Sequence, residues 1–352
     1  MNQDHTRSFH GGTLVLAALA TVLIGGGAPA TMGGTSACPG ALTTTAAIQN
    51  AMLNATPGTT ILIAPGTYVG RFSSGRSGTG ASPIVLKSCD PTSPAVLSGS
   101  SVSDGSYGIH LTGDHWEIRD LVVTRYQKGI VVDNGNHNLL TGLEVHEIGD
   151  EGVHFRDGSS YNTLDRSTIH DTGQYQSWFG EGAYVGSDVN SNYEHTVFGN
   201  VIRQTVFAGG ITAEHIDVKE GADGTIVEYC TFNGSGISGN NSADSFVDVK
   251  GVNTIVRYNQ GSRNGNPAVV DAFQVRTHGT GYPTGRNNSF HGNRVDLDAI
   301  SGYVVYATSA TAGTTAHSDV RVGGGNLYSS NVSSPTTASR PITWGAVKRL
   351  YR

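Results

Sequence analysis

The chain has 352 residues, and 49 of them are glycine, about twice the usual share. Only 14% of the residues are charged, 37% are hydrophobic, and the formal net charge is −6. This hydrophobic content at low net charge argues against intrinsic disorder, and so much glycine with so little charge argues against a helical bundle. The mild acidity also argues against a nucleic-acid partner, which would favour a basic surface.

The first 30 residues predict a signal peptide rather than a part of the fold. Arg7 precedes a short apolar run over 14–24, and the small residues of 28–30 (APA) offer a cleavage site. The apolar run is too short to span a bilayer, and no other stretch reaches that length. We therefore expect a secreted protein without a membrane partner.

The three cysteines suggest one disulfide and one free thiol. In an oxidising compartment, Cys38 could pair with Cys89 and tie the mature N-terminus to the first part of the fold. Cys230 lies in the strand-like run 227–232 (VEYCTF) and is expected to be a buried free thiol.

Residues 43–52 (TTTAAIQNAM) predict a short amphipathic helix, which is followed by a turn and the apolar strand 60–64 (TILIA). A helix followed by the stretch TILIAPGTY resembles the start of many right-handed parallel β-helices. The resemblance implies that this helix caps the first coil.

A short strand recurs six times at intervals of 23 to 33 residues, as expected of a solenoid. Its copies are 129–133 (GIVVD), 152–156 (GVHFR), 182–186 (GAYVG), 215–219 (HIDVK), 246–250 (FVDVK) and 272–276 (AFQVR). A second series follows the copies in turn, at 138–140, 162–164, 195–197, 224–226, 253–255 and 288–290. We therefore predict an all-β fold, a single-stranded right-handed parallel β-helix over residues 38–330, with a short N-terminal capping helix. The tail 331–352 is left unassigned.

Strand alternation predicts which side chains point out of the coil. The second and fourth residues of each copy are mostly apolar, so the third and fifth residues should form two outward columns. The third-position column is Val131, His154, Tyr184, Asp217, Asp248 and Gln274, and the fifth-position column is Asp133, Arg156, Gly186, Lys219, Lys250 and Arg276. Coils stack about 4.8 Å apart, so Lys219, Lys250 and Arg276 should lie within roughly 10 Å on one face. Stacked like charges repel and favour a functional role over a solvated face whose ion pairs contribute little.

The stretch 214–219 (EHIDVK) resembles the β-helical polysaccharide lyases that include chondroitinase B and alginate lyases. In that family a Glu precedes the catalytic Lys by five positions, as Glu214 precedes Lys219. The family's catalytic Arg lies on the next coil, where this chain has Lys250, and Arg276 follows one coil later. The resemblance therefore implies a polysaccharide lyase whose second basic group is either Lys250 or Arg276.

The chemistry of β-elimination explains these residue types. Removing the proton beside a uronate carboxylate creates an enolate-like dianion, so the site needs a base and positive charge over the carboxylate. We expect Lys219 to be the base and Lys250 or Arg276 to stabilise charge or relay a proton. Near neutrality, Lys219 would need a pKa roughly 3 units below its reference value of about 10.4.

Acidic groups beside Lys219 would raise its pKa, so they need compensation. A cation bound by Glu214, Asp217 and Asp248 would provide it and would also bind the substrate carboxylate, and Ca²⁺ suits such an all-oxygen site. Further outward groups are expected to contact substrate, namely His215, Gln274, His278, Tyr184 and Arg156. His154, His215 and His278 are also possible acids.

The expected partner is an acidic polysaccharide bound by a monomer, and the sequence leaves open which uronic-acid polymer it is. One alternative is a β-helical glycoside hydrolase, which needs two carboxylates such as Asp217 and Asp248. The other is a non-catalytic carbohydrate-binding solenoid.

Overall fold

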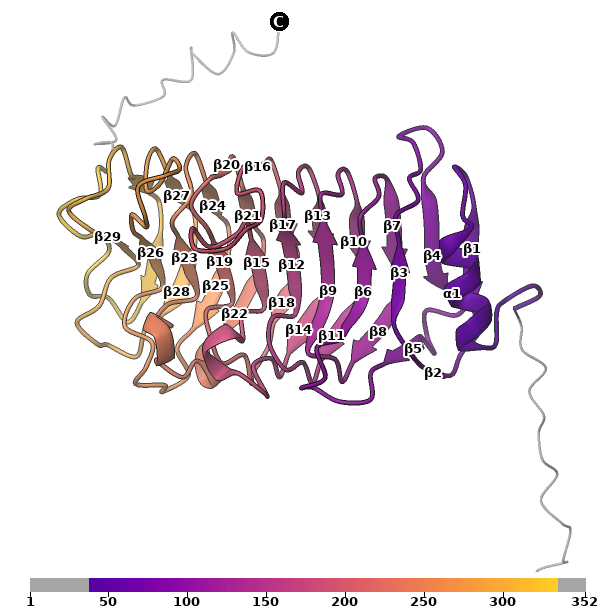
Figure 1. The fold of residues 1–352 in the computed structure, drawn as a ribbon. Helices are drawn as coiled ribbons and strands as arrows, with labels where there is room; N and C mark the ends of the chain where they lie inside the picture. Colours follow the sequence, from indigo (N-terminus) through magenta and orange to yellow (C-terminus); the bar gives the residue numbers. More distant parts are fainter. Residues whose placement is uncertain (1–37, 335–352) are drawn as a thin grey trace, which may run out of the picture. The chain divides into compact units, whose positions relative to one another are not determined.

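The computed structural model describes residues 38–334, which wind into a parallel β-helix (Figure 1). Three parallel sheets run along the solenoid, and each coil contributes one short strand to each sheet over most of its length. The predicted all-β solenoid is therefore confirmed. The predicted signal peptide 1–30 and the tail beyond residue 334 lie outside the described residues, and the boundary at 330 stays a prediction.

The strands of the three sheets are two to six residues long. Sheet A contains β1 (Thr60–Ile63), β4 (Ile84–Ser88), β7 (Trp116–Arg119), β10 (Leu139–Thr141), β13 (Thr163–Asp165), β17 (Val201–Arg203), β21 (Ile226–Glu228), β24 (Ile255–Arg257), β27 (Ser289–His291) and β30 (Thr315–His317). Sheet B contains β2 (Thr67–Val69), β5 (Ala95–Ser98), β8 (Leu121–Thr124), β11 (Glu144–His146), β14 (Thr168–His170), β18 (Val206–Phe207), β22 (Thr231–Asn233), β25 (Gln260–Ser262), β28 (Arg294–Asp296) and β31 (Val320–Val322). Sheet C contains β3 (Phe72–Ser74), β6 (Tyr107–Leu111), β9 (Lys128–Asp133), β12 (Val153–Arg156), β15 (Ala183–Val185), β19 (Ile216–Val218), β23 (Val247–Val249), β26 (Phe273–Val275) and β29 (Val305–Ala307).

A few elements lie outside these sheets. They are the strand pair β16 (Val197–Phe198) and β20 (Ala222–Asp223), and the 3₁₀ turns η1 (Ser177–Phe179), η2 (Gly234–Gly236) and η3 (Asn240–Ser242). None of the helices within residues 38–334 is long and apolar enough to cross a membrane.

The predicted helix is α1 (Thr45–Leu53), which packs at the β1 end of the solenoid (Figure 1). It begins after Thr44, whose side chain accepts a hydrogen bond from the backbone N–H of Ala47 at 3.2 Å. Ile48 and Met52 on its inner face are fully buried in the same core as the strands. The helix thus closes the apolar interior of the first coil.

The cysteines behave as predicted. Cys38 and Cys89 form a disulfide that closes 51 residues of chain, and Cys230 is a buried free thiol. The disulfide joins the segment before α1 to the end of β4.

Sheet C confirms the predicted register of the six strand copies. The inward residues that pair from coil to coil are Ile130, Val153, Ala183, Ile216, Val247 and Phe273. Each is at most 1% exposed. The third-position residues pair in the same register on the outer face, so the predicted column does run across sheet C.

A ladder of buried asparagines leads into sheet A and corrects one predicted strand. The backbone N–H of Asn138 donates to the side-chain oxygen of Asn162 at 2.9 Å, and that of Asn162 donates to Asn200 at 2.9 Å. The copy predicted at 195–197 is therefore wrong, because β17 begins just after Asn200. Residues 195–196 instead belong to an inserted loop, and Val197 lies in the separate pair β16–β20.

Candidate active site

A cavity of about 380 Å³ lies on the outer face of sheet C. Its lining includes Lys219, Lys250 and Arg276, the three cations that the strand pattern predicts to lie together. Asp217 on β19 and Asp248 on β23 lie between them and pair in register on neighbouring strands. We refer to these five residues as the trench cluster.

Loops on both sides of sheet C form the walls of this cavity. Phe179 of η1 and the residues Asn241 and Ser242 of η3 line it from segments that precede the strands. Asp188 and His278 line it from segments that follow the strands. The trench-cluster residues that these loops enclose are largely buried, but the cavity leaves open space beside them.

The two lysines of the trench cluster share their carboxylate partners. The ammonium of Lys250 donates to Asp217 Oδ1 at 2.7 Å and lies 2.8 Å from Asp248 Oδ2. The ammonium of Lys219 lies 3.5 Å from Asp217 Oδ2 and 3.3 Å from Asp188 Oδ2. Asp217 therefore bridges the two lysines.

Arg276 forms the more open end of the cluster. Its guanidinium donates to Asp244 Oδ1 at 2.8 Å and lies 3.5 Å from Asp248 Oδ1. It also donates to the side-chain oxygen of Gln274. The Arg276 side chain is 24% exposed, against 7% for Lys219 and 12% for Lys250.

The carboxylates around Lys219 raise its pKa, as the sequence predicts for acidic neighbours without a bound cation. Its burial disfavours the charged amine, but the nearby carboxylates of Asp217, Glu220 and Asp188 outweigh burial and raise the pKa of Lys219. The pKa of Lys250 is raised in the same way, since Asp217 and Asp248 outweigh the effect of burial. Lys219 therefore lacks, in the protein without substrate, the lowered pKa that it would need to act as a base near neutrality.

A column of glutamates beneath the trench is a feature that the strand pattern missed. Glu151, Glu181 and Glu214 each lie two residues before the first inward residue of β12, β15 and β19, and each is at most 6% exposed. Burial, followed by repulsion from Asp217, raises the pKa of Glu214 to about 8. Burial and the neighbouring Glu151 and Glu214 raise the pKa of Glu181 well above its ordinary value. The same offset in three consecutive copies could have revealed this column.

The predicted calcium ligands do line one cavity, but their environment does not fit a calcium ion. Lys250 holds both Asp217 and Asp248 within 2.8 Å, so an ammonium takes the position between these carboxylates. Glu214, the third predicted ligand, is buried, and burial followed by repulsion from Asp217 raises its pKa to about 8, which favours the protonated carboxyl. Two carboxylates already bound to an ammonium and a carboxyl that favours its proton make a poor all-oxygen donor set for Ca²⁺.

His215 is not a substrate contact, and this prediction is wrong. Its side chain is fully buried, it packs against the rings of Phe232 and Phe246, and its Nε2 lies 2.9 Å from the backbone oxygen of Asn233. Burial lowers the pKa of His215 to about 4. The residue lies before β19 begins, where the chain is still turning, so strand alternation does not apply to it.

The other predicted substrate contacts lie on the outer face of sheet C or in the loops beside it. Tyr184 lines the cavity, and its ring centroid lies 5.3 Å from the ammonium of Lys219. His278 lines the same cavity, and its Nδ1 lies 3.0 Å from Glu220 Oε1. Gln274 instead borders an adjoining cavity of about 480 Å³ that Arg276 shares.

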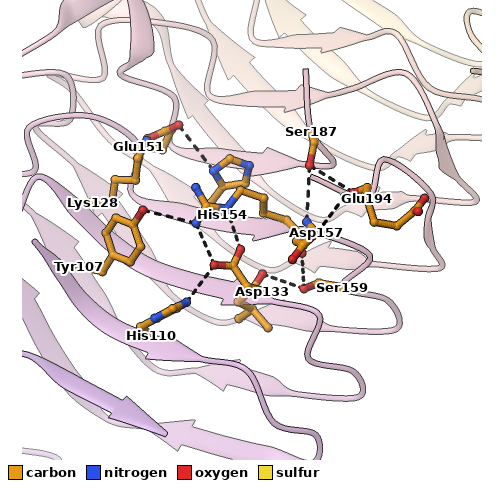
Figure 2. A network of polar contacts seen from close by, with 12 residues as sticks. Tyr107, His110, Lys128, Asp133, Glu151, His154, Asp157, Ser159, Ser187 and Glu194 are labelled. Atoms are coloured by element: carbon orange, nitrogen blue, oxygen red, sulfur yellow. Dashed lines mark hydrogen bonds and ion pairs between the residues drawn. The ribbon is translucent and has the colours of Figure 1, made fainter. Parts of the chain in front are cut away.

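Arg156 belongs to a second charged group on the same face, which we call the side cluster: Lys128, Asp133, Glu151, His154 and Arg156. The guanidinium of Arg156 donates to both carboxylate oxygens of Asp133, at 2.7 and 2.8 Å. Lys128 donates to Glu151, which also lies 3.5 Å from His154 Nδ1 (Figure 2). A cavity of about 190 Å³ lies over this cluster, and Tyr184 borders both this cavity and the one at the trench cluster.

The coil arrangement and the charged outer face of sheet C define a right-handed β-helix of the pectin-lyase-like class. The family described as "Pel9A-like, right handed beta helix region" matches residues 30–206, which is half of the chain. The chain belongs to this family, and the predicted resemblance to β-helical polysaccharide lyases is confirmed.

Individual relatives agree with this assignment. The crystal structure of an alginate lyase from Paenibacillus sp. str. FPU-7 is 46% identical, with a TM-score of 0.80 over 83% of this chain and 98% of that chain. The structure of pectate lyase Pel9A has 21% identity and a TM-score of 0.54 over 81% of this chain and 72% of that chain, which shows a shared fold. Pectate lyase L of Dickeya chrysanthemi is 33% identical over 134 residues. That match covers 34% of this chain and only 31% of the curated relative.

Proposed function

We propose that the protein is a secreted polysaccharide lyase that cleaves a uronic-acid-containing polysaccharide by β-elimination. The observation that carries this proposal is the meeting of Lys219, Lys250 and Arg276 around one cavity on the outer face of sheet C. The 46% identity to an alginate lyase over nearly all of that chain supports it. The Cys38–Cys89 disulfide supports an oxidising compartment such as the cell exterior.

The exposure and the contacts of the three cations suggest a different role for each of them. Arg276 is the most exposed of the three cations and borders two adjoining cavities, so we assign it to the substrate carboxylate. Lys250 is held by two aspartates and fixes the charge arrangement beneath the substrate. Lys219 is assigned as the base, because its ammonium nitrogen lies between Asp188 on the wall and Asp217 on the floor.

In the proposed reaction, the neutral amine of Lys219 takes the proton next to the substrate carboxylate. The positive groups of the site stabilise the resulting enolate-like dianion. The electron pair forms a carbon–carbon double bond as the bond to the glycosidic oxygen breaks. Tyr184 is assigned to protonate that leaving oxygen, because it lines the same cavity with its ring centroid 5.3 Å from the Lys219 ammonium. Burial and nearby Asp217 raise the pKa of its phenol, so the phenol still carries its proton at the alkaline pH at which Lys219 loses one.

The raised pKa of Lys219 predicts an alkaline enzyme. The amine that accepts a proton forms only as the pH approaches and passes the usual lysine range, since Asp217, Glu220 and Asp188 stabilise the charged form. The rate should therefore increase with pH through the neutral range and beyond. No step of this proposal uses a metal at Glu214, Asp217 and Asp248, because these residues do not fit one.

The hydrolase alternative is less well supported. It assigns the two catalytic carboxylates to Asp217 and Asp248, one of which must be protonated to act as an acid. Both aspartates are bound by Lys250, and the pKa of Asp217 is lowered, since the two lysines outweigh the effect of burial. Neither residue is placed to donate a proton.

The test is a screen of uronic-acid polymers for new ultraviolet absorbance, using alginate, pectate, glucuronan and glycosaminoglycans at pH 7 to 10. We expect an unsaturated product from at least one polymer, with a rate that rises with pH. Lys219→Ala should lower this rate by about 10²–10⁴-fold, the usual contribution of a general base. New reducing ends without absorbance would indicate hydrolysis, and tight binding without any product would indicate a binding solenoid.

A further inference from the structure

The cavity of about 190 Å³ over the side cluster adjoins the cavity at the trench cluster, and we refer to it as the side cavity. Phe179, Tyr184 and Asp188 border both cavities, so a polymer that lies across the trench cluster continues into the side cavity. The sugar residue that neighbours the cleaved one on this side therefore meets a different set of side chains.

The two cations in the lining of the side cavity are already bound by carboxylates of the protein. Arg156 donates to both oxygens of Asp133, at 2.7 and 2.8 Å, and its side chain is only 7% exposed. Lys128 donates to Glu151, which lines the same cavity. A cation that a nearby carboxylate already neutralises attracts a second carboxylate only weakly, so this lining has no free positive charge for a uronate.

Two aromatic residues are instead the most exposed members of the lining. Tyr193 is 38% exposed, and its ring centroid lies 4.1 Å from the guanidinium carbon of Arg156, so the ring covers part of that cation. Phe179 is 43% exposed and borders the cavity from η1. The imidazole of His154 adds no charge at neutral pH, because burial lowers its pKa.

We propose that the side cavity binds the sugar residue next to the cleaved one through its ring and does not recognise its carboxylate. The C–H groups of a pyranose ring pack against apolar surfaces such as Phe179 and Tyr193, and this contact is the same whether or not the ring carries a carboxylate. The inference rests on the proposed lyase function and narrows its substrate requirement. Charge recognition is confined to the trench cluster, where Arg276 is 24% exposed, and the neighbouring position accepts an uncharged sugar. The substrate class thus includes polymers that mix uronate and neutral residues.

The test uses the polymer with the highest rate in the lyase screen, after a known fraction of its carboxyl groups has been reduced to primary alcohols. A reduced residue has no carboxylate beside the proton to be removed, so it cannot itself be cleaved by β-elimination, and each cut marks a uronate at the trench cluster. Mass spectrometry of the products then identifies the residues on both sides of each cut. We expect reduced residues at one neighbouring position or more as often as in the intact polymer.

Variants connect this tolerance to the side cavity. Tyr193→Ala should raise KM about tenfold on the unmodified and the reduced polymer alike, with kcat nearly unchanged, because it removes a ring contact and not a charge contact. Arg156→Gln should leave the frequency of reduced residues at the tolerant position unchanged. Tyr229→Ala is the matched control, since Tyr229 is 54% exposed on the turn after β21 of sheet A, and it should leave KM unchanged.

Depletion of reduced residues at both neighbouring positions would overturn the proposal, as would a KM of Tyr193→Ala equal to that of wild type. The unmodified polymer separates this result from the proposed function. Absence of an ultraviolet-absorbing product from every polymer would contradict the lyase activity, whereas normal cleavage with depletion on both sides would contradict only the assignment of the side cavity.

Discussion

The trench cluster and the side cluster lie on the same face of sheet C but distribute their charges differently. In the side cluster Arg156 and Lys128 do not share a carboxylate: Arg156 pairs with Asp133, and Lys128 pairs with Glu151 and lies 3.8 Å from Asp150. In the trench cluster, Asp217 contacts both lysines and Lys250 contacts two aspartates. Separate cation–carboxylate pairs are typical of structural sites, whereas pairs with shared members beside a larger cavity can be redistributed when a polyanion binds.

The largest expected difference between the clusters concerns activity. Arg276→Gln should lower kcat/KM by about 10²–10³-fold, because it removes positive charge where the dianion develops. Arg156→Gln should lower it by less than about tenfold, because both oxygens of Asp133 already occupy its guanidinium. The measurement is the initial rate of ultraviolet absorbance with the best polymer from the screen. Equal losses in the two variants would remove the distinction.

The next difference concerns stability. Lys250→Met should lower the free energy of unfolding by about 3–5 kcal/mol, because it removes the closest cation of two buried aspartates at once and leaves them only the 3.5 Å contacts to Lys219 and Arg276. Lys128→Met should cost only about 1–3 kcal/mol, because Glu151 keeps His154 as a partner. Urea unfolding followed by circular dichroism measures both values. A larger loss in Lys128→Met would show that the side cluster is the more tightly coupled one.

The last expected difference is a pH dependence of opposite sign for Glu214, beside the trench cluster, and Glu151 of the side cluster. The pKa of Glu214 rises from 4.5 to about 8 on folding, so its stabilising contribution is present below pH 4.5 and is lost as the pH rises through 8. Wild type should therefore lose on the order of a few kcal/mol relative to Glu214→Gln between pH 5 and 9.

Glu151 provides the control with the opposite sign. Despite burial, Lys128 and His154 lower its pKa, so its contribution is present above pH 4.5 and is lost as the pH falls. Wild type should therefore lose stability relative to Glu151→Gln only on acidification. Tm measurements of the three proteins from pH 3 to 9 check both signs, and parallel curves would contradict the assignment.

Sequence patterns predict sheet C because two independent constraints agree there. Apolar residues such as Ile216 and Val218 must point inward, and parallel stacking then aligns the outward residues of neighbouring coils. The same reasoning fails for His215, which lies in a bend before β19, and for the segment 195–197, which lies in an insertion outside sheet A. There the buried side chain of Asn200, not apolar alternation, marks the next strand of sheet A.

The pairing of charges within the site could not be read from sequence. Lys250 lies one coil beyond Asp217, and whether its ammonium or a metal ion occupies the space between the aspartates depends on side-chain positions at the scale of an ångström. Asp188 and Glu220 lie in segments without a repeat, so no period marks them. The three glutamates of the column, in contrast, each lie two residues before the first inward residue of their strand, so the sequence repeat could have predicted them.

The cap at the β1 end of the solenoid affects how the protein can associate with other copies of itself. β1 is the last strand of sheet A on that side, and an open β-helix end would offer strand edges and apolar interior to another molecule. α1 covers this end with Ile48 and Met52, and the bond between Cys38 and Cys89 prevents the segment leading into α1 from peeling away. Covalent closure of the terminal rung thereby guards against head-to-tail polymerisation in the environment where such a protein would work.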